Sequence, residues 1–470
     1  MPPAWTITGP IPRFPEPRSD FLLLIQNEDD DPQAQNRRGC FRVNRRGMSL
    51  DAVPIGSYSV NRCRRPIKRE WRFGAVVAVQ DREADKSMTA SSLEVGARVR
   101  LAAGDFQHLL AALTGRGYQV MGPTLEDGQL IYGEIAQVTD LPLTWTALQE
   151  AGTFRLKPRQ DQAFFGFAVG QQSWKQFLLP PLQTLWQAHR EGGGWRVIPQ
   201  TAAVPQFAFI GVRACELNAM AVQDRVYLQG AHIDPTYEAR REQAFIVAVN
   251  CAHQDPGTCF CVSLGTGPRV TAGFDLALTE VLQGGDHFFV VEIGTPRGAE
   301  VIQAAPQTTA APEEIEAANR LVAAIAGNMG RVLDPTGIKE TLYANYEHPR
   351  WDEVAARCLN CGNCTMVCPT CFCHTLEDSL DLTGAAAERR RHLDSCFTVD
   401  FSYLHGGSIR TSPKSRYRQW LTHKLAAWID QFGCSGCVGC GRCITWCPVG
   451  IDITEEVRAI RETAARPPKE

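Results

Sequence analysis

Two cysteine runs near the carboxyl end of the sequence constrain its fold more than any other feature. Each has the spacing C-x2-C-x2-C-x3-C and is followed by proline. A loop with two-residue gaps brings three thiols together, whereas the fourth thiol, a helical turn further on, points away from them. The runs are Cys358, Cys361, Cys364 and Cys368, and then Cys437, Cys440, Cys443 and Cys447.

This template is typical of the ferredoxin runs that bind [4Fe-4S] clusters, in which the fourth thiolate of one run ligates the other cluster. It therefore predicts crossed ligand sets. One cluster takes Cys358, Cys361, Cys364 and Cys447, and the other takes Cys437, Cys440, Cys443 and Cys368. Gly362, Gly439 and Gly441 would let the backbone fold over a cluster and aim N–H groups at its sulfurs. Structural zinc is the alternative, but zinc usually binds two C-x2-4-C pairs and does not need this repeated template.

A further four cysteines lie in a region of alternating helices and strands, and two of them follow predicted strands. Side chains from different loops can converge at strand ends. Two interpretations stay open, a third [4Fe-4S] cluster or buried thiols that pack as small hydrophobes. These residues are Cys215, Cys251, Cys259 and Cys261.

The remaining cysteines carry weaker signals. Cys40 and Cys63 lie in the amino-terminal leader, and we assign them no role. The other four could hold zinc or another cluster, but free structural thiols are the favoured interpretation. They are Cys371, Cys373, Cys396 and Cys434, of which Cys396 lies close in sequence to His392.

Composition indicates a globular protein of two or three domains. The chain has 470 residues, of which 44% are hydrophobic and 21% charged, with a net charge of −3. It has no secretory signal and no run approaching the roughly 18 apolar residues that a membrane helix needs. We therefore expect a cytoplasmic protein with no membrane span and no nucleic-acid partner. In that reducing compartment, eighteen cysteines favour metal or redox chemistry over disulfides.

The predicted fold class is α+β, with a mixed α/β domain followed by an α-helical, ferredoxin-like domain that holds two [4Fe-4S] clusters. The mixed domain spans residues 89–340, the helical domain 341–460 and a tail 461–470. Residues 1–88 are either a disordered basic leader or an extension upstream of a true start at Met88. Between Arg37 and Arg72 this segment has eleven Lys or Arg against two acids and no regular periodicity.

Hydrophobic patterns predict the individual elements. Strands are expected at 118–122, 129–135, 206–212, 244–250 and 287–294. Helices are expected at 105–117, at 173–190 with a break at Pro180 and Pro181, at 216–228, 235–243, 312–330 and 348–360, and at 415–430 between the two runs.

Motifs of independent enzymes are missing from the sequence. It contains no G-x-G-x-x-G, no G-x-x-x-x-G-K-[ST], no H-E-x-x-H and no G-x-S-x-G. No independent substrate site is therefore predicted. Clusters without a substrate site indicate an electron carrier that works inside a complex.

Several stretches resemble the beta subunits of cytoplasmic [NiFe] hydrogenases of the sulfhydrogenase type, which are similar to the iron–sulfur subunits of anaerobic sulfite reductases. They are "GVRACELNAM", "VNCAHQDPGTCFCVSLGTGP", "GFDLALTE", "CLNCGNCTMVCPTCFC", "LDSC", "RYRQWLTHK" and "CVGCGRCITWCPVGID", spanning about 211 to 453.

The resemblance implies a tetramer. Its partners would be the large and small hydrogenase subunits and a flavin subunit that exchanges electrons with NAD(P)H. This chain would carry electrons between the [NiFe] core and the flavin subunit. The alternative is the iron–sulfur subunit of an anaerobic sulfite reductase or another sulfur-reducing complex.

Overall fold

The computed structural model describes residues 93–200 and 204–464, all within a compact unit that runs from Lys86 to Glu470. The expectations for residues 1–88, including those for Cys40 and Cys63, fall outside the described residues, as does most of the predicted tail. No helix in the described ranges is long and apolar enough to cross a membrane.

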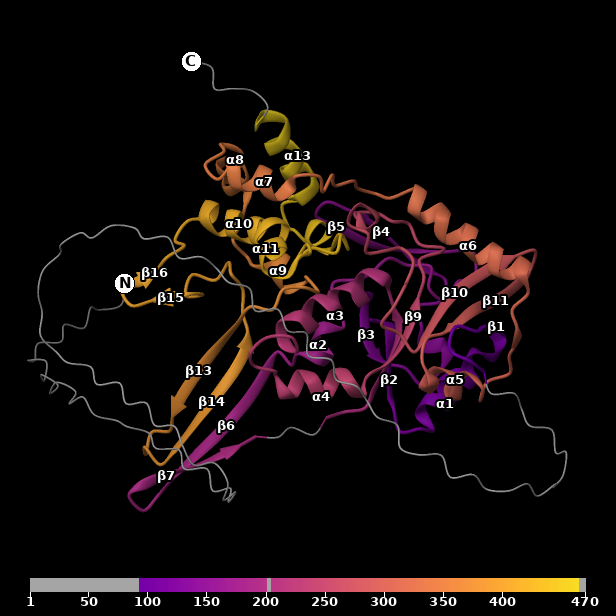
Figure 1. The fold of residues 1–470 in the computed structure, drawn as a ribbon, viewed down its shortest axis with the longest axis horizontal. Helices are drawn as coiled ribbons and strands as arrows, with labels where there is room; N and C mark the ends of the chain where they lie inside the picture. Colours follow the sequence, from indigo (N-terminus) through magenta and orange to yellow (C-terminus); the bar gives the residue numbers. More distant parts are fainter. Residues whose placement is uncertain (1–92, 201–203, 465–470) are drawn as a thin grey trace, which may run out of the picture. The chain divides into compact units, whose positions relative to one another are not determined.

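An eight-stranded mixed sheet organises the first part of the described chain (Figure 1). Its order is β12-β1-β11-β10-β9-β8-β2-β3. The neighbours β2, β8, β9 and β10 run parallel, and the outer pairings are antiparallel. The strands are β1 (Arg98–Ala102), β2 (Gln119–Glu126), β3 (Gln129–Glu134), β8 (Phe207–Val212), β9 (Phe245–Val249), β10 (Leu276–Gln283), β11 (Asp286–Ile293) and β12 (Thr308–Thr309).

Helices cover both faces of this sheet, which explains why its central strands are continuously apolar. Successive side chains of β9 point to opposite faces. Phe245 and Val247 join the core with α1 (Phe106–Thr114) and α5 (Pro296–Ile302). Ile246 and Ala248 join the core with α2 (Lys175–Leu178), α3 (Ala214–Tyr227) and α4 (Pro235–Gln243). A sixth helix, α6 (Pro312–Gly327), packs on β10 and β11.

Both cysteine runs lie among helices that share a separate core built around Trp351, Trp420 and Leu421. Short helices α9 and α12 begin within the runs. The helices of this region are α7 (Ile338–Ala344), α8 (Arg350–Arg357), α9 (Asn363–Met366), α10 (Pro413–Thr422), a π-helical segment (His423–Ala427), α11 (Trp428–Phe432), α12 (Arg442–Thr445) and α13 (Ile453–Ala464).

A four-stranded antiparallel sheet joins segments far apart in the sequence. Its order is β13-β14-β6-β7, and β14 pairs with β6 across about two hundred residues of chain. Two hairpins complete the fold. The strands are β4 (Trp145–Glu150), β5 (Thr153–Pro158), β6 (Leu182–Glu191), β7 (Gly194–Pro199), β13 (His374–Leu380), β14 (Ala386–Leu393), β15 (Tyr403–Leu404) and β16 (Gly407–Ser408).

This sheet corrects two expectations. The break expected at Pro180 and Pro181 is present, but the predicted helix 173–190 is wrong after it, because residues 182–191 form β6. The expectation of an α-helical region at 341–460 is wrong for residues 374–393, which form β13 and β14. The mixed α/β character of the first part is confirmed. The division at residue 340 stays a prediction.

Candidate metal centres

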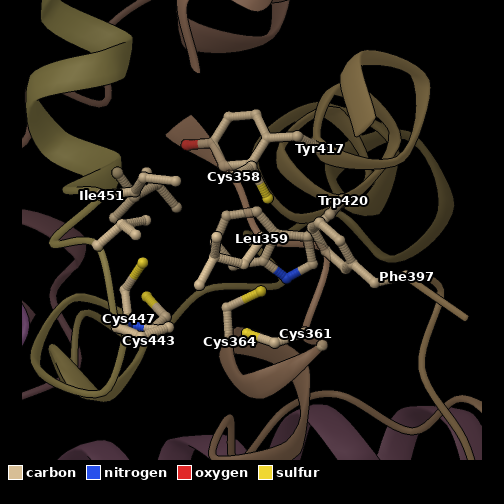
Figure 2. A pocket seen from close by; sticks show the side chains of 14 residues that line it. Cys358, Leu359, Cys361, Cys364, Phe397, Tyr417, Trp420, Cys443, Cys447 and Ile451 are labelled. Atoms are coloured by element: carbon tan, nitrogen blue, oxygen red, sulfur yellow. The ribbon is translucent and has the colours of Figure 1, made fainter. Parts of the chain in front are cut away.

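An apolar cavity among the helices is lined by thiols from both cysteine runs (Figure 2). It contains about 450 Å³ of space not filled by atoms. Three cysteines come from the first run and two from the second, so the four residues of the first predicted set all line one cavity. The five are Cys358, Cys361, Cys364, Cys443 and Cys447.

The same local backbone geometry presents both runs. Positive φ angles at Gly362 (+72°) and Gly441 (+75°) turn the chain into α9 and α12. Glycine adopts this conformation without the steric cost that a Cβ brings. In the second run the Gly439 N–H donates to the Cys437 sulfur at 3.4 Å. At the matching place in the first run, the Asn360 N–H donates to the sulfur of Cys358 at 3.5 Å.

Two buried donors in the wall of this cavity fit a sulfur-containing group. Within residues 93–200 and 204–464, neither the Tyr417 hydroxyl nor the Trp420 Nε1–H has a hydrogen-bond partner. A buried donor without an acceptor costs about 1–3 kcal/mol. Cluster sulfides and ligand thiolates are acceptors that would satisfy both groups.

The second predicted set is Cys437, Cys440, Cys443 and Cys368. These four do not line one cavity in the described part of the chain, because Cys443 lines the first cavity, Cys440 a second one and Cys437 a surface depression. Burial raises the pKa of Cys437 to about 12. Burial also raises the pKa of Cys443 well above its usual value, and the neighbouring thiols of Cys437, Cys440 and Cys368 add to the rise. Because these groups would repel one another as free thiolates, the donor set fits a cationic metal core, which deprotonates the thiols it binds.

The four cysteines of the possible third cluster, Cys215, Cys251, Cys259 and Cys261, line a second cavity with about 450 Å³ of unfilled space. Cys215 lies in the first turn of α3, directly after β8, and Cys251 follows β9. The carboxyl ends of these adjacent parallel strands meet at one edge of the sheet. Cys259 and Cys261 reach the cavity from the following loop. Burial raises the pKa of Cys261 to about 12, with Cys251 and Cys440 contributing.

Direct contacts join this second cavity to the second cysteine run. The Phe260 N–H donates to the Gly439 carbonyl oxygen at 2.8 Å, and the Thr258 hydroxyl donates to that of Gly441 at 3.1 Å. Cys440 lines the second cavity, just as Cys443 lines the first. The second run therefore lies between the two cavities.

A buried ion pair that the sequence did not single out also connects these regions. Arg442, in α12, lies 2.6 Å from Glu216 in α3, and each side chain is 1% exposed. The Trp174 Nε1–H donates to Glu216 at 3.1 Å. Burial disfavours the charged guanidinium, but Glu216 together with Cys440, Tyr132 and Cys215 outweighs burial and raises the pKa of Arg442. The sequence hinted at this pair because Glu216 directly follows a cysteine in "ACEL" and Arg442 directly precedes one in "CGRC".

The other four cysteines do not form one set. Cys371 lies beside Cys368. Cys373 and Cys396 line an open groove, whereas Cys434 lines a different depression. Among the described residues, no three His, Cys, Asp or Glu side chains are arranged to hold a single metal ion.

Comparisons with known proteins agree with this geometry. A family model described as a 4Fe-4S dicluster domain matches residues 357–451, which contain both cysteine runs. The chain is also similar to sulfhydrogenase 2 subunit beta of Pyrococcus furiosus, with 32% identity over 260 residues. The aligned region covers 55% of this chain and 75% of the relative.

Proposed function

Because the chain belongs to the family of sulfhydrogenase beta subunits, we propose that it carries electrons through three [4Fe-4S] clusters inside a multi-subunit hydrogenase complex. The proposal rests mainly on the two thiol-lined cavities, with the second cysteine run between them. When bound, each cluster supplies a one-electron couple whose potential depends on its surroundings.

The proposed ligands follow the crossed pattern. The first cavity holds Cys358, Cys361, Cys364 and Cys447. The middle site uses Cys437, Cys440, Cys443 and Cys368. The third uses Cys215, Cys251, Cys259 and Cys261. The cavity linings support the first and third sets. The mutual influence of Cys443, Cys437, Cys440 and Cys368 supports the middle set.

The chain's own residues hold and insulate these sites. Phe397, Tyr417 and Trp420 wall the first cavity on the side of α10, and Ile451 and Ile453 line it as well. Apolar walls limit water access, which influences the potential of a bound cluster. Backbone N–H groups directed at thiol sulfurs add a second control on the potential.

We propose that the partner at one end of the electron path is a flavin subunit, which exchanges electrons with NAD(P)H. The partners at the other end are the large and small hydrogenase subunits. Gene neighbours that encode a nickel-binding large subunit would support this assignment. A neighbouring sirohaem subunit would instead indicate the sulfite reductase alternative.

Cysteine variants test the ligand map. Cys361→Ser should remove one cluster and lower the iron content of the anaerobically purified chain by about one third, because one of three clusters is lost. Cys434→Ser is the matched control in the described part of the chain and should keep full iron, as should Cys40→Ser. Full iron in Cys361→Ser would show that the ligand map is wrong.

A second variant tests the third set separately. Cys259→Ser should also remove about one third of the iron and leave the EPR signals of the other two clusters in place. If its iron content equals that of the unmodified chain, the four cysteines of the third set are structural thiols.

A further inference from the structure

Two buried lysines meet at the loop that carries the fourth cysteine of the first run. Lys424 is 4% exposed, and its Nζ lies 3.1 Å from the sulfur of Cys368 and 2.9 Å from the hydroxyl of Thr370. Lys175 is 8% exposed and donates to the carbonyl oxygens of Cys368 and Cys371 at 3.0 and 3.1 Å. Both ammonium groups therefore act on the same short loop.

The backbone of Lys424 is anchored to the other run. Lys424 lies in the π-helical segment between α10 and α11. Its carbonyl oxygen accepts a hydrogen bond from the Gly436 N–H at 2.8 Å, directly before Cys437. Short π-helical segments within α-helices are frequent at functional sites. Lys424 thus links the start of the second run to the last cysteine of the first.

Neither ammonium is neutralised by a carboxylate in the part of the chain that the structure describes. The lysine–carboxylate pairs there involve Lys339 and Lys414. The nearby buried Arg442, by contrast, is paired with Glu216. An ammonium taken out of water without a counter-charge is costly. The counter-charge available to Lys424 is the thiolate of Cys368, which it contacts directly.

We propose that Lys424, supported by Lys175, is a positioning residue that holds a positive charge against the Cys368 ligand and raises the reduction potential of the middle cluster. This inference rests on the ligand map of the proposed function. Net charge and hydrogen bonds to the sulfurs set the potentials of such clusters. The first cavity contains no charged side chain in its wall. The middle cluster therefore accepts an electron at a higher potential than the cluster in the first cavity.

A redox titration followed by EPR tests this on the anaerobically purified full chain. The middle cluster is identified as the signal that disappears in Cys437→Ser, and the first-cavity cluster as the one that disappears in Cys358→Ser. In Lys424→Met, which removes the charge and the donor but keeps the length, the middle cluster should titrate at a more negative potential. Lys414→Met, on the surface, is the control and should leave every potential unchanged.

The outcomes are distinct. Wild-type potentials in an iron-replete Lys424→Met overturn the proposal. If that variant does not retain iron, Lys175→Met carries the test and should show a smaller negative shift, and wild-type potentials there likewise overturn it. A middle cluster that is harder to reduce than the first-cavity cluster in the unmodified chain also overturns it. Failure of the proposed function would look different, because the unmodified chain would then contain no iron and labile sulfide to titrate.

Discussion

For single residues, the neighbouring side chains and backbone determine the pKa and the contacts of each thiol. Spacing alone singled out the eight cysteines of the two runs, because the repeated template with a following proline is typical of ferredoxin runs, and the matched dicluster domain contains both of them. It could not identify Lys424, which lies 56 positions from the thiol that it contacts. It also grouped Cys434 with Cys373 and Cys396, although the fold separates them.

The reactivity of Cys373 should depend on pH in the neutral range. The neighbouring Cys396 thiol and backbone stabilise its thiolate and lower the pKa of Cys373 to about 7. Since the thiolate is the nucleophile, its alkylation by iodoacetamide should rise as the pH increases through 7 and then level off. In Cys396→Ala this rise should move to higher pH, because the stabilising thiol is gone. Peptide mass spectrometry after timed alkylation measures the profile, and an unchanged profile in the variant would contradict the assignment.

At the scale of elements, short-range patterns were sufficient where a helix or strand is determined locally. The predicted strands 206–212, 244–250 and 287–294 correspond to β8, β9 and β11, and the predicted helix 235–243 is α4. Residues 182–191 form a strand because they pair with β7 through a tight turn between Glu191 and Gly194, and with β14 from the far end of the chain. The pairing with β14 could not be predicted locally, but the turn at Gly192 to Gly194 was a local signal for the hairpin, and the helix expected there was wrong.

The glycines that bring the third cysteine set against the second run offer an element-scale test. A Cβ at Gly441 would lie 2.6 Å from the carbonyl carbon and oxygen of Thr258, at a φ of +75°. Gly441→Ala should therefore lower the free energy of unfolding by about 3 kcal/mol or more, because the added Cβ strains the left-handed backbone and overlaps Thr258. Gly433→Ala is the matched control, since its φ is +69° and no atom lies within 4 Å of the added Cβ. Its cost should stay near 1 kcal/mol, the cost of left-handed strain alone. Equal costs in thermal unfolding would show that the close contact with Thr258 does not matter.

At the scale of the whole molecule, the ion pair of Glu216 and Arg442 ties the large sheet to the second cysteine run. Removal of one partner from a buried pair leaves an uncompensated charge, which costs about 3–5 kcal/mol. Arg442→Met should therefore unfold at a markedly lower temperature, and Glu216→Gln should do the same. The double variant should lose less than the sum of the two single losses, because no lone charge remains.

An exposed pair gives the control for this cycle. Arg389 and Asp378 lie 2.6 Å apart on the four-stranded sheet, where solvent screens their interaction. Arg389→Met should cost less than about 1 kcal/mol. If the stability losses of the two single variants simply add up in the double variant, Glu216 and Arg442 do not stabilise each other. The sheet and the second run would then be stabilised independently. Such a long-range pairing could not be predicted from the sequence, which placed the two residues in separate domains.

The number of clusters can be measured as iron and acid-labile sulfide in the anaerobically purified chain, together with EPR after dithionite reduction. If three cysteine sets hold three [4Fe-4S] clusters, the chain contains about twelve irons and about twelve sulfides and gives signals from interacting clusters. About eight irons would restrict the clusters to the two runs and leave the third set as structural thiols. Tightly bound zinc without labile sulfide would contradict the electron-transfer function altogether.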